Sequence, residues 1–186
     1  MSSRPPSARL SLALLGLSLA LLLTACGGDD DGSASPTTTF PRTVQTFPVQ
    51  GGVHVQGSVA YPQVPPVGGD HNPVWQNCGY YSKPVAPERA VHSMEHGAVW
   101  ITYRPGLAAA DVDSLHRLAR SRTYVLVSPW QDASLPAPIV ASAWGVQLKL
   151  EHASDPALAS FVSTYAGGRQ APEPGAPCTG GFGTPE

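Results

Sequence analysis

Four histidines between residues 54 and 96 have the side-chain type and the spacing of metal ligands. His92 and His96 are the first and last residues of the run HSMEH, and His54 and His71 precede them in the sequence. Imidazole nitrogens are common ligands of zinc, copper and other transition-metal ions. The sequence therefore predicts a metal site in which copper or zinc is bound by His92, His96, His71 and His54.

The conformation of the run HSMEH decides which of its side chains can share an ion. In a helix, His92 and His96 lie one turn apart on one face, as zinc ligands often do. In an extended chain, His92, Met94 and His96 point to one side, and that softer set suits copper. Gly97 and the apolar run after it favour an extended or turn conformation.

Two other interpretations of the histidines stay open. In one, the rings are structural and bonded to the backbone, with Glu88 and Glu95 as partners, and the chain is a non-catalytic domain that docks on an envelope protein. In the other, the chain is a small metal-dependent enzyme with Glu95 as acid or base. Convergence of the four histidines at one open cavity would favour metal binding. Histidines scattered over the domain would favour the interaction domain.

The run also matches H-x-x-E-H, the inverted zinc-protease motif, but its context argues against a protease. That motif requires a helix in a large catalytic domain and a further acidic ligand downstream. Here a strand is predicted directly afterwards, and the late acids are Glu151 and Glu173, the latter in a proline-rich tail. Nothing in the sequence points to turnover.

The elements that must position these residues indicate an α+β fold. Apolar runs and helical spacing predict a mixed sheet of four to five strands, with two helices on one face and long Pro/Gly-rich loops. The expected strands are 53–59, 98–103, 124–127, 139–144 and 146–150, and the expected helices are 108–120 and 155–165. The long loop 61–87 carries His71, together with Trp75 and Tyr81 as candidates for the wall of a pocket, whereas Trp100 and Trp144 are core candidates.

The N-terminus has the features of a bacterial lipoprotein. Residues 1–25 combine two arginines, an apolar segment at 10–23 and the lipobox-like sequence LTAC that ends at Cys26. We expect cleavage before Cys26, lipid on its thiol, and anchoring to the extracytoplasmic face of the cell membrane. Residues 26–46 are then a flexible tether, and 47–186 a single globular domain.

Charge and cysteine content narrow the possible partners. The formal net charge is −2 and no basic patch is present, which argues against nucleic acid as a partner. Export would put Cys78 and Cys178 in an oxidising compartment, where an even count favours a disulfide over a thiolate metal site.

Long runs of the sequence resemble a bacterial family known only as domain of unknown function 3105. They read GGDHNPVWQNCGYY at 68–81, ERAVHSMEHGAVWITYRP at 88–105, VASAWG at 140–145 and PEPGAPCTGG at 172–181. The resemblance covers about 47–183 and implies an extracytoplasmic domain whose two cysteines pair, with no established activity. The family's pattern has leucine where this chain has Met94, which argues against Met94 as a required metal ligand.

Overall fold

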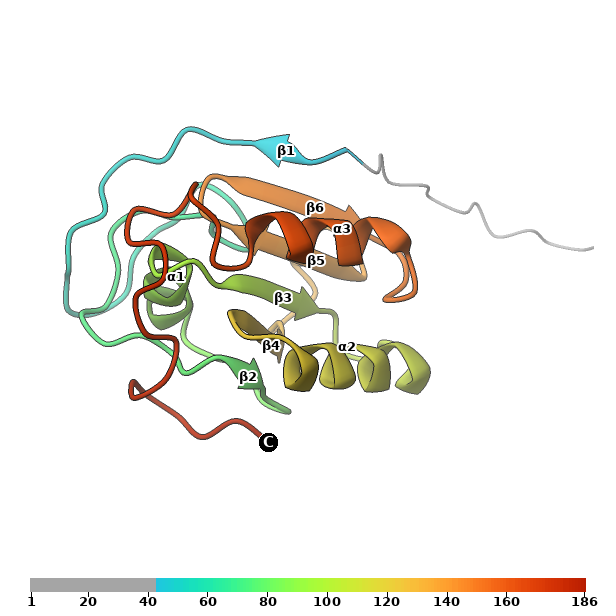
Figure 1. The fold of residues 1–186 in the computed structure, drawn as a ribbon. Coiled ribbons are helices and arrows are strands. Elements are labelled where there is room, and N and C mark those ends of the chain that lie inside the picture. Colours follow the sequence, from blue (N-terminus) through green and yellow to red (C-terminus); the bar gives the residue numbers. More distant parts are fainter. Residues whose placement is uncertain (1–42) are drawn as a thin grey trace, which may run out of the picture. The chain divides into compact units, whose positions relative to one another are not determined.

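The computed structural model describes residues 43–186; the predicted signal segment, Cys26 and most of the tether lie outside the described residues. The described chain folds into a mixed sheet and three helices (Figure 1). The strands are β1 (Gln45–Thr46), β2 (Gly79–Tyr80), β3 (Val99–Tyr103), β4 (Val125–Pro129), β5 (Ile139–Ala143) and β6 (Val146–Leu150). The helices are α1 (Pro87–Glu95), α2 (Ala109–Ser121) and α3 (Pro156–Tyr165).

The strands lie in the order β1-β6-β5-β3-β4-β2. The pairs β3–β4 and β4–β2 are parallel, and the other three pairs are antiparallel. Helix α2 makes the crossover that a parallel β3–β4 pair requires, while β5 and β6 form a tight hairpin at Gly145. The sheet also includes residues 45 and 46, which the sequence analysis assigned to the tether.

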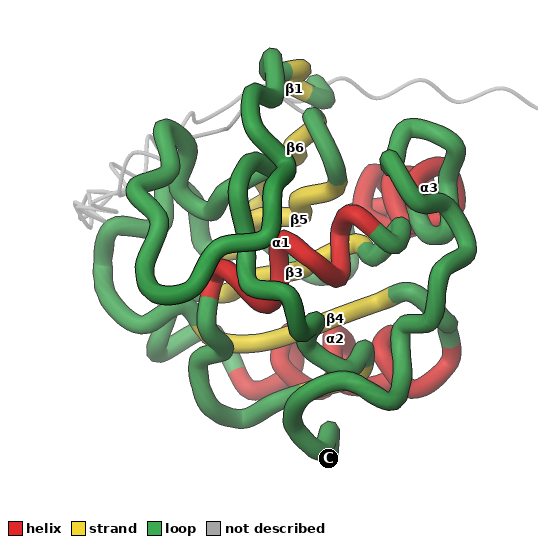
Figure 2. Tube along the Cα trace, turned by 90° about the vertical axis from the view of Figure 1, so that its left-hand side faces the viewer, coloured by secondary structure: helices red, strands yellow, loops and turns green. Residues whose placement is uncertain are grey.

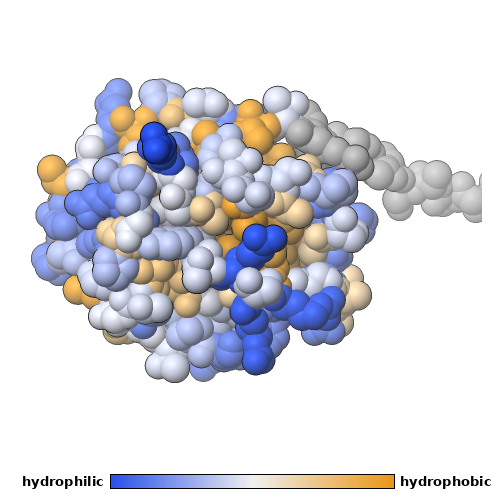
Figure 3. Space-filling view, in the orientation of Figure 1, coloured by the Kyte–Doolittle hydropathy of each residue, from blue (hydrophilic) through white to orange (hydrophobic). Residues whose placement is uncertain are grey.

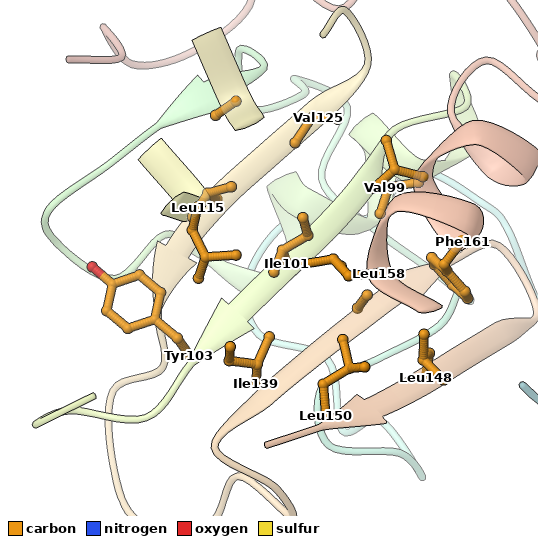
Figure 4. Close-up of a cluster of buried hydrophobic side chains, with 14 of the residues drawn as sticks. Val99, Ile101, Tyr103, Leu115, Val125, Ile139, Leu148, Leu150, Leu158 and Phe161 are labelled. Atoms are coloured by element: carbon orange, nitrogen blue, oxygen red, sulfur yellow. The ribbon is translucent and has the colours of Figure 1, made fainter. Parts of the chain in front are cut away.

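Helices α2 and α3 cover one face of the sheet. Side chains alternate along a strand, so Val99 and Ile101 point to this face and pack with Leu115 of α2 and Phe161 of α3 (Figure 4). Asp155 caps α3 by accepting a hydrogen bond from the Ala157 amide. On the outside, this face of the molecule is mostly polar, with small separated apolar patches (Figure 3).

Helix α1 packs on the opposite face of the sheet. Its Val91 and Met94 are fully buried in a second apolar cluster with Trp100, whose side chain points away from α2 and α3. Long loops pass around α1 in Figure 2. The cluster fixes the helix, and the helix presents its remaining side chains to those loops.

The C-terminal segment is held against the loop before α1. Cys78 and Cys178 form a disulfide, with their Cα atoms 5.4 Å apart, as expected. The Phe182 amide donates to Trp75 O and the Asn77 amide to Phe182 O. The tail is therefore an ordered part of the domain.

The prediction of an α+β domain with a mixed sheet is confirmed, but its details need correction. There are six strands and three helices among the described residues, and the helices lie on both faces, not on one. Residues 53–59 are not a strand; His54 makes only an isolated bridge to His71. The extended or turn conformation expected for HSMEH is wrong, because Pro87 starts a helix that continues to Glu95.

The length and hydrophobicity of the helices decide whether one of them could cross a membrane. No helix among residues 43–186 is both long and apolar enough to cross a bilayer.

Candidate metal centre

Helix α1 brings three potential ligands onto one face. His92, Glu95 and His96 are spaced i, i+3 and i+4, which puts their side chains over one another on a helix. All three are buried. Gly97, with a φ of +105°, then ends the helix and lets the chain turn into β3.

His71 and His54 reach the same place from the long loop and the segment before it. The Val55 amide donates to His71 O at 2.7 Å, and the His71 amide donates to Val53 O at 3.1 Å. Asp70 strengthens this bridge because its Oδ1 accepts from the amides of Gly52 and Val53. Backbone pairing thus fixes His54 beside His71.

Glu95 lies at the centre of the first donor group. Its Oε2 is 3.0 Å from Nε2 of His71, 3.7 Å from Nε2 of His54 and 4.0 Å from Nε2 of His92. One ligand atom from each of these four residues lies within 4.8 Å of the others. Metal ions bind such convergent sets of nitrogen and carboxylate oxygen.

A second donor group shares Glu95 with the first. It consists of Glu95, His96 and Glu173, again with ligand atoms within 4.8 Å of one another. His96 Nε2 is 3.7 Å from Glu173 Oε2. Glu173 reaches the site because the C-terminal segment folds back onto the end of α1.

Backbone carbonyls orient three of the histidine rings. Nδ1 of His71 donates to Gly69 O at 2.8 Å, Nδ1 of His92 to Asn72 O at 2.6 Å, and Nδ1 of His96 to Pro177 O at 2.7 Å. Because a carbonyl oxygen only accepts, each Nδ1 must carry a proton. A neutral ring held in this way has its lone pair on Nε2, which is the arrangement that supports metal-binding histidines. In all three rings Nε2 faces the cluster, and that of His71 lies 3.0 Å from Glu95 Oε2.

The two histidines of α1 face each other through these lone pairs. Nε2 of His92 lies 3.0 Å from Nε2 of His96. Two lone pairs at this distance repel unless a cation, either a proton or a metal ion, lies against them. Burial is the largest cause that lowers the pKa of His92 below 6.5, and the neighbouring histidines lower it further, although its bond to Asn72 O opposes the shift.

The first donor group is exposed to solvent only at His54. The side chains of His71, His92 and Glu95 are at most 9% exposed, whereas that of His54 is 51% exposed. The ring of Trp75 packs against His96 and His92, with centroid distances of 5.0 and 5.6 Å. An ion could therefore reach the first donor group past His54.

The four histidines predicted as ligands do come together. The other two histidines lie outside both donor groups: His152 is exposed beside Asp111, as expected, whereas His116, also expected in solvent, packs on Tyr80. Trp75, a candidate for the wall of a pocket, packs against two of the histidines. Met94 belongs to the apolar core.

Sequence reasoning missed two donors. Glu95 was considered as a hydrogen-bond partner or an acid, and Glu173 only as an unsuitable protease ligand. The i, i+3, i+4 spacing of His92, Glu95 and His96 would have identified Glu95 if the segment had been taken as a helix. No local signal identifies Glu173, because its position depends on the fold of the tail.

Comparison with known proteins gives a family without an assigned activity. No curated protein and no solved structure matches the chain. A family model described as protein of unknown function (DUF3105) matches residues 53–180, a range that includes every donor of both groups and both cysteines. This match covers more than half of the chain and confirms the resemblance, so the chain belongs to the DUF3105 family.

Proposed function

We propose that this protein binds a divalent transition-metal ion, zinc or copper, in the cluster of His54, His71, His92, His96 and Glu95. The observation that carries the proposal is the shared orientation of three rings, each held through Nδ1 by a backbone carbonyl. Their Nε2 atoms all face the cluster, where those of His92 and His96 lie 3.0 Å apart and that of His71 lies 3.0 Å from Glu95 Oε2, so metal ions could bind all three.

The chemistry of the donors favours zinc or copper(II). Nitrogen and carboxylate oxygen suit these ions, whereas copper(I) prefers thiolates and thioethers. The single nearby thioether, that of Met94, is buried in the apolar core. Ligands at about 2.0–2.1 Å from an ion lie roughly 3 Å apart, and two donor pairs already have a separation of 3.0 Å.

The opening at His54 fits a role in binding, handling or sensing a metal. A buried site with one exposed ligand can exchange its ion with the surroundings without unfolding. No reaction needs to be assumed for this role.

The test of this function is the metal content of the full chain. The protein would be produced with its signal segment in a bacterium, without a histidine tag, and extracted in detergent. Zinc and copper would be counted by mass spectrometry, and affinity measured by competition with a chelator. We expect near-stoichiometric metal in the natural sequence and none in the double variant His92→Ala/His96→Ala.

A second double variant controls for the loss of two histidines. His116→Ala/His152→Ala removes two rings that belong to neither donor group and should keep its metal. Added zinc should also raise the melting temperature of the natural protein, because a ligand that binds only the folded state stabilises it. A protein that is isolated without metal, and whose melting temperature zinc and copper do not change, would contradict the proposal.

We further infer that lipid on Cys26 anchors the protein to the extracytoplasmic face of the cell membrane. The support is the sequence of residues 1–26, with its arginines, apolar segment and LTAC ending. Cells fed labelled palmitate should label the natural chain but not Cys26→Ser, and the variant should leave the membrane fraction. Equal labelling of both chains would exclude this anchor.

A further inference from the structure

The cluster contains more ligands than one ion of this kind uses. The two donor groups contain six residues, namely the four histidines, Glu95 and Glu173. The contact between His92 and His96 links the two groups. Structural zinc sites in proteins are almost always four-coordinate. The donors are thus enough for two ions with incomplete shells, and too many for one.

Only one residue belongs to both groups, and its chemistry allows it to bridge. Glu95 has two carboxylate oxygens, each of which can bind a different ion. A histidine whose Nδ1 donates to a backbone carbonyl has only Nε2 left and can bind one ion. Two neighbouring ions need a ligand that can bind both of them. The two donor groups share such a ligand, the carboxylate of Glu95.

The backbone holds Glu173 at the site, although its side chain is 60% exposed. Its amide donates to Glu95 O at 3.0 Å, and the Gly175 amide donates to His96 O at 3.2 Å. These two bonds satisfy carbonyls that the end of α1 leaves free. His96 Nδ1 is bonded to Pro177 O of the same segment, so the ring and Glu173 are positioned together.

From this geometry we propose a dinuclear centre in which Glu95 bridges two divalent ions. His54, His71 and His92 bind the first ion, and His96 and Glu173 bind the second. Ions in two-metal sites are about 3.5–4 Å apart, a separation that one carboxylate spans. The second ion has fewer ligands and an exposed one, so it binds more weakly. This inference rests on the proposed function and adds the number of ions and their division among the ligands.

The experiment counts zinc ions on the intact protein by native mass spectrometry during a titration. The natural sequence should reach two ions in two steps. Glu173→Gln should stop at one ion, with the first step unchanged within a factor of about three. Glu151→Gln removes a carboxylate outside both groups and should still reach two.

Copper(II) gives a second measurement that reports whether the ions are neighbours. Two copper(II) ions joined by a carboxylate couple magnetically, so the electron paramagnetic resonance signal of the natural protein at two equivalents should differ from that of one equivalent. Glu173→Gln should show only the uncoupled signal. His54→Ala/His71→Ala should lose the tighter step.

The two proposals fail in different ways. Saturation of the natural protein at one ion, or two ions on Glu173→Gln, would overturn the dinuclear centre and leave a single metal site. A natural protein that binds no ion would overturn both. Two magnetically independent copper ions would also overturn the bridge through Glu95.

Discussion

At the scale of residues, the backbone acceptors of the imidazoles define this site more sharply than the histidines themselves. The carbonyls of Gly69, Asn72 and Pro177 fix which nitrogen of each ring faces the cluster. The sequence predicted the four histidines, but it could not predict these carbonyls, because they come from loops without regular structure. A backbone carbonyl is not marked by any residue type in the sequence.

Met94 tests whether the sulfur of the HSMEH run takes part in binding. The Met94 side chain is fully buried with Val91 and Trp100, so Met94→Leu exchanges one apolar side chain for another of similar volume. We expect unchanged metal affinity and a stability loss below about 1.5 kcal/mol. The measurements are chelator competition and urea unfolding. A large fall in affinity with normal stability would instead make Met94 a ligand.

Asp70 should contribute both to the pH dependence of stability and to the position of His54. Hydrogen bonds from the Val53 and Gly52 amides lower the Asp70 pKa below its ordinary 3.8. The ionised carboxylate thus stabilises the folded state above pH 3.8, and this contribution is lost as the pH falls through the folded-state pKa. Asp70→Asn should melt earlier than the natural protein at pH 7, with a gap that narrows toward pH 3.

A matched carboxylate separates the effect of Asp70 on the site from a general surface effect. Asp132 also has a lowered pKa, through Ser134 in a turn, but it does not contact the histidine segment. Metal affinity should fall in Asp70→Asn, because the segment of His54 is released, and stay constant in Asp132→Asn. Equal metal affinities in both variants would show that Asp70 does not position the site.

At the scale of elements, α1 is the feature that the sequence patterns concealed. Pro87 and the nine-residue length suit a short helix, but half of its six buried residues are polar. His92, Ser93 and Glu95 are buried along with Ala90, Val91 and Met94, and the buried His96 follows at the C-cap. Apolar periodicity therefore fails where the function is located. The strands at 98–103, 139–144 and 146–150 were predicted well because their buried runs are continuous, whereas β1 and β2 are two residues long and have no period.

Gly97 should be essential for the turn from α1 to β3. Its φ is +105°, and a Cβ there would lie 3.0 Å from the Cα of Gly167. Gly97→Ala adds a steric clash to backbone strain and should lower the free energy of unfolding by about 2–4 kcal/mol. Gly106→Ala has a similar φ of +83° with nothing near the added Cβ, so it should cost only about 1 kcal/mol. Urea unfolding of both variants tests this difference; equal losses would show that packing against Gly167 is unimportant.

At the scale of the whole molecule, the disulfide joins the C-terminal segment to the loop before α1 and helps to complete the site. The sequence predicted that Cys78 and Cys178 pair, and they do. It could not predict that the tail beyond α3 would deliver Pro177 O and Glu173 to His96, because that contact exists only in the folded chain. The general fold and most ligands were therefore predictable, but the part of the site that depends on the tail was not.

Loss of the disulfide should weaken both the fold and the metal site. The bridge closes a loop with a sequence separation of 100, so Cys78→Ala/Cys178→Ala should lose about 4–5 kcal/mol of stability in the chain-entropy model. Metal affinity should fall as well, since His96 and Glu173 depend on the tail. A reductant should destabilise the natural protein and leave the variant unchanged. Full stability after verified reduction would contradict this role.

The most direct test of the central claim is an anomalous diffraction measurement on crystals of the zinc-loaded protein. Data collected on both sides of the zinc absorption edge locate the ions independently of any assumption about their ligands. The account predicts anomalous peaks about 2.0–2.1 Å from the Nε2 atoms of His71, His92 and His96, with Glu95 beside them. Peaks only at other surface residues, or none in the cluster at saturating zinc, would contradict it.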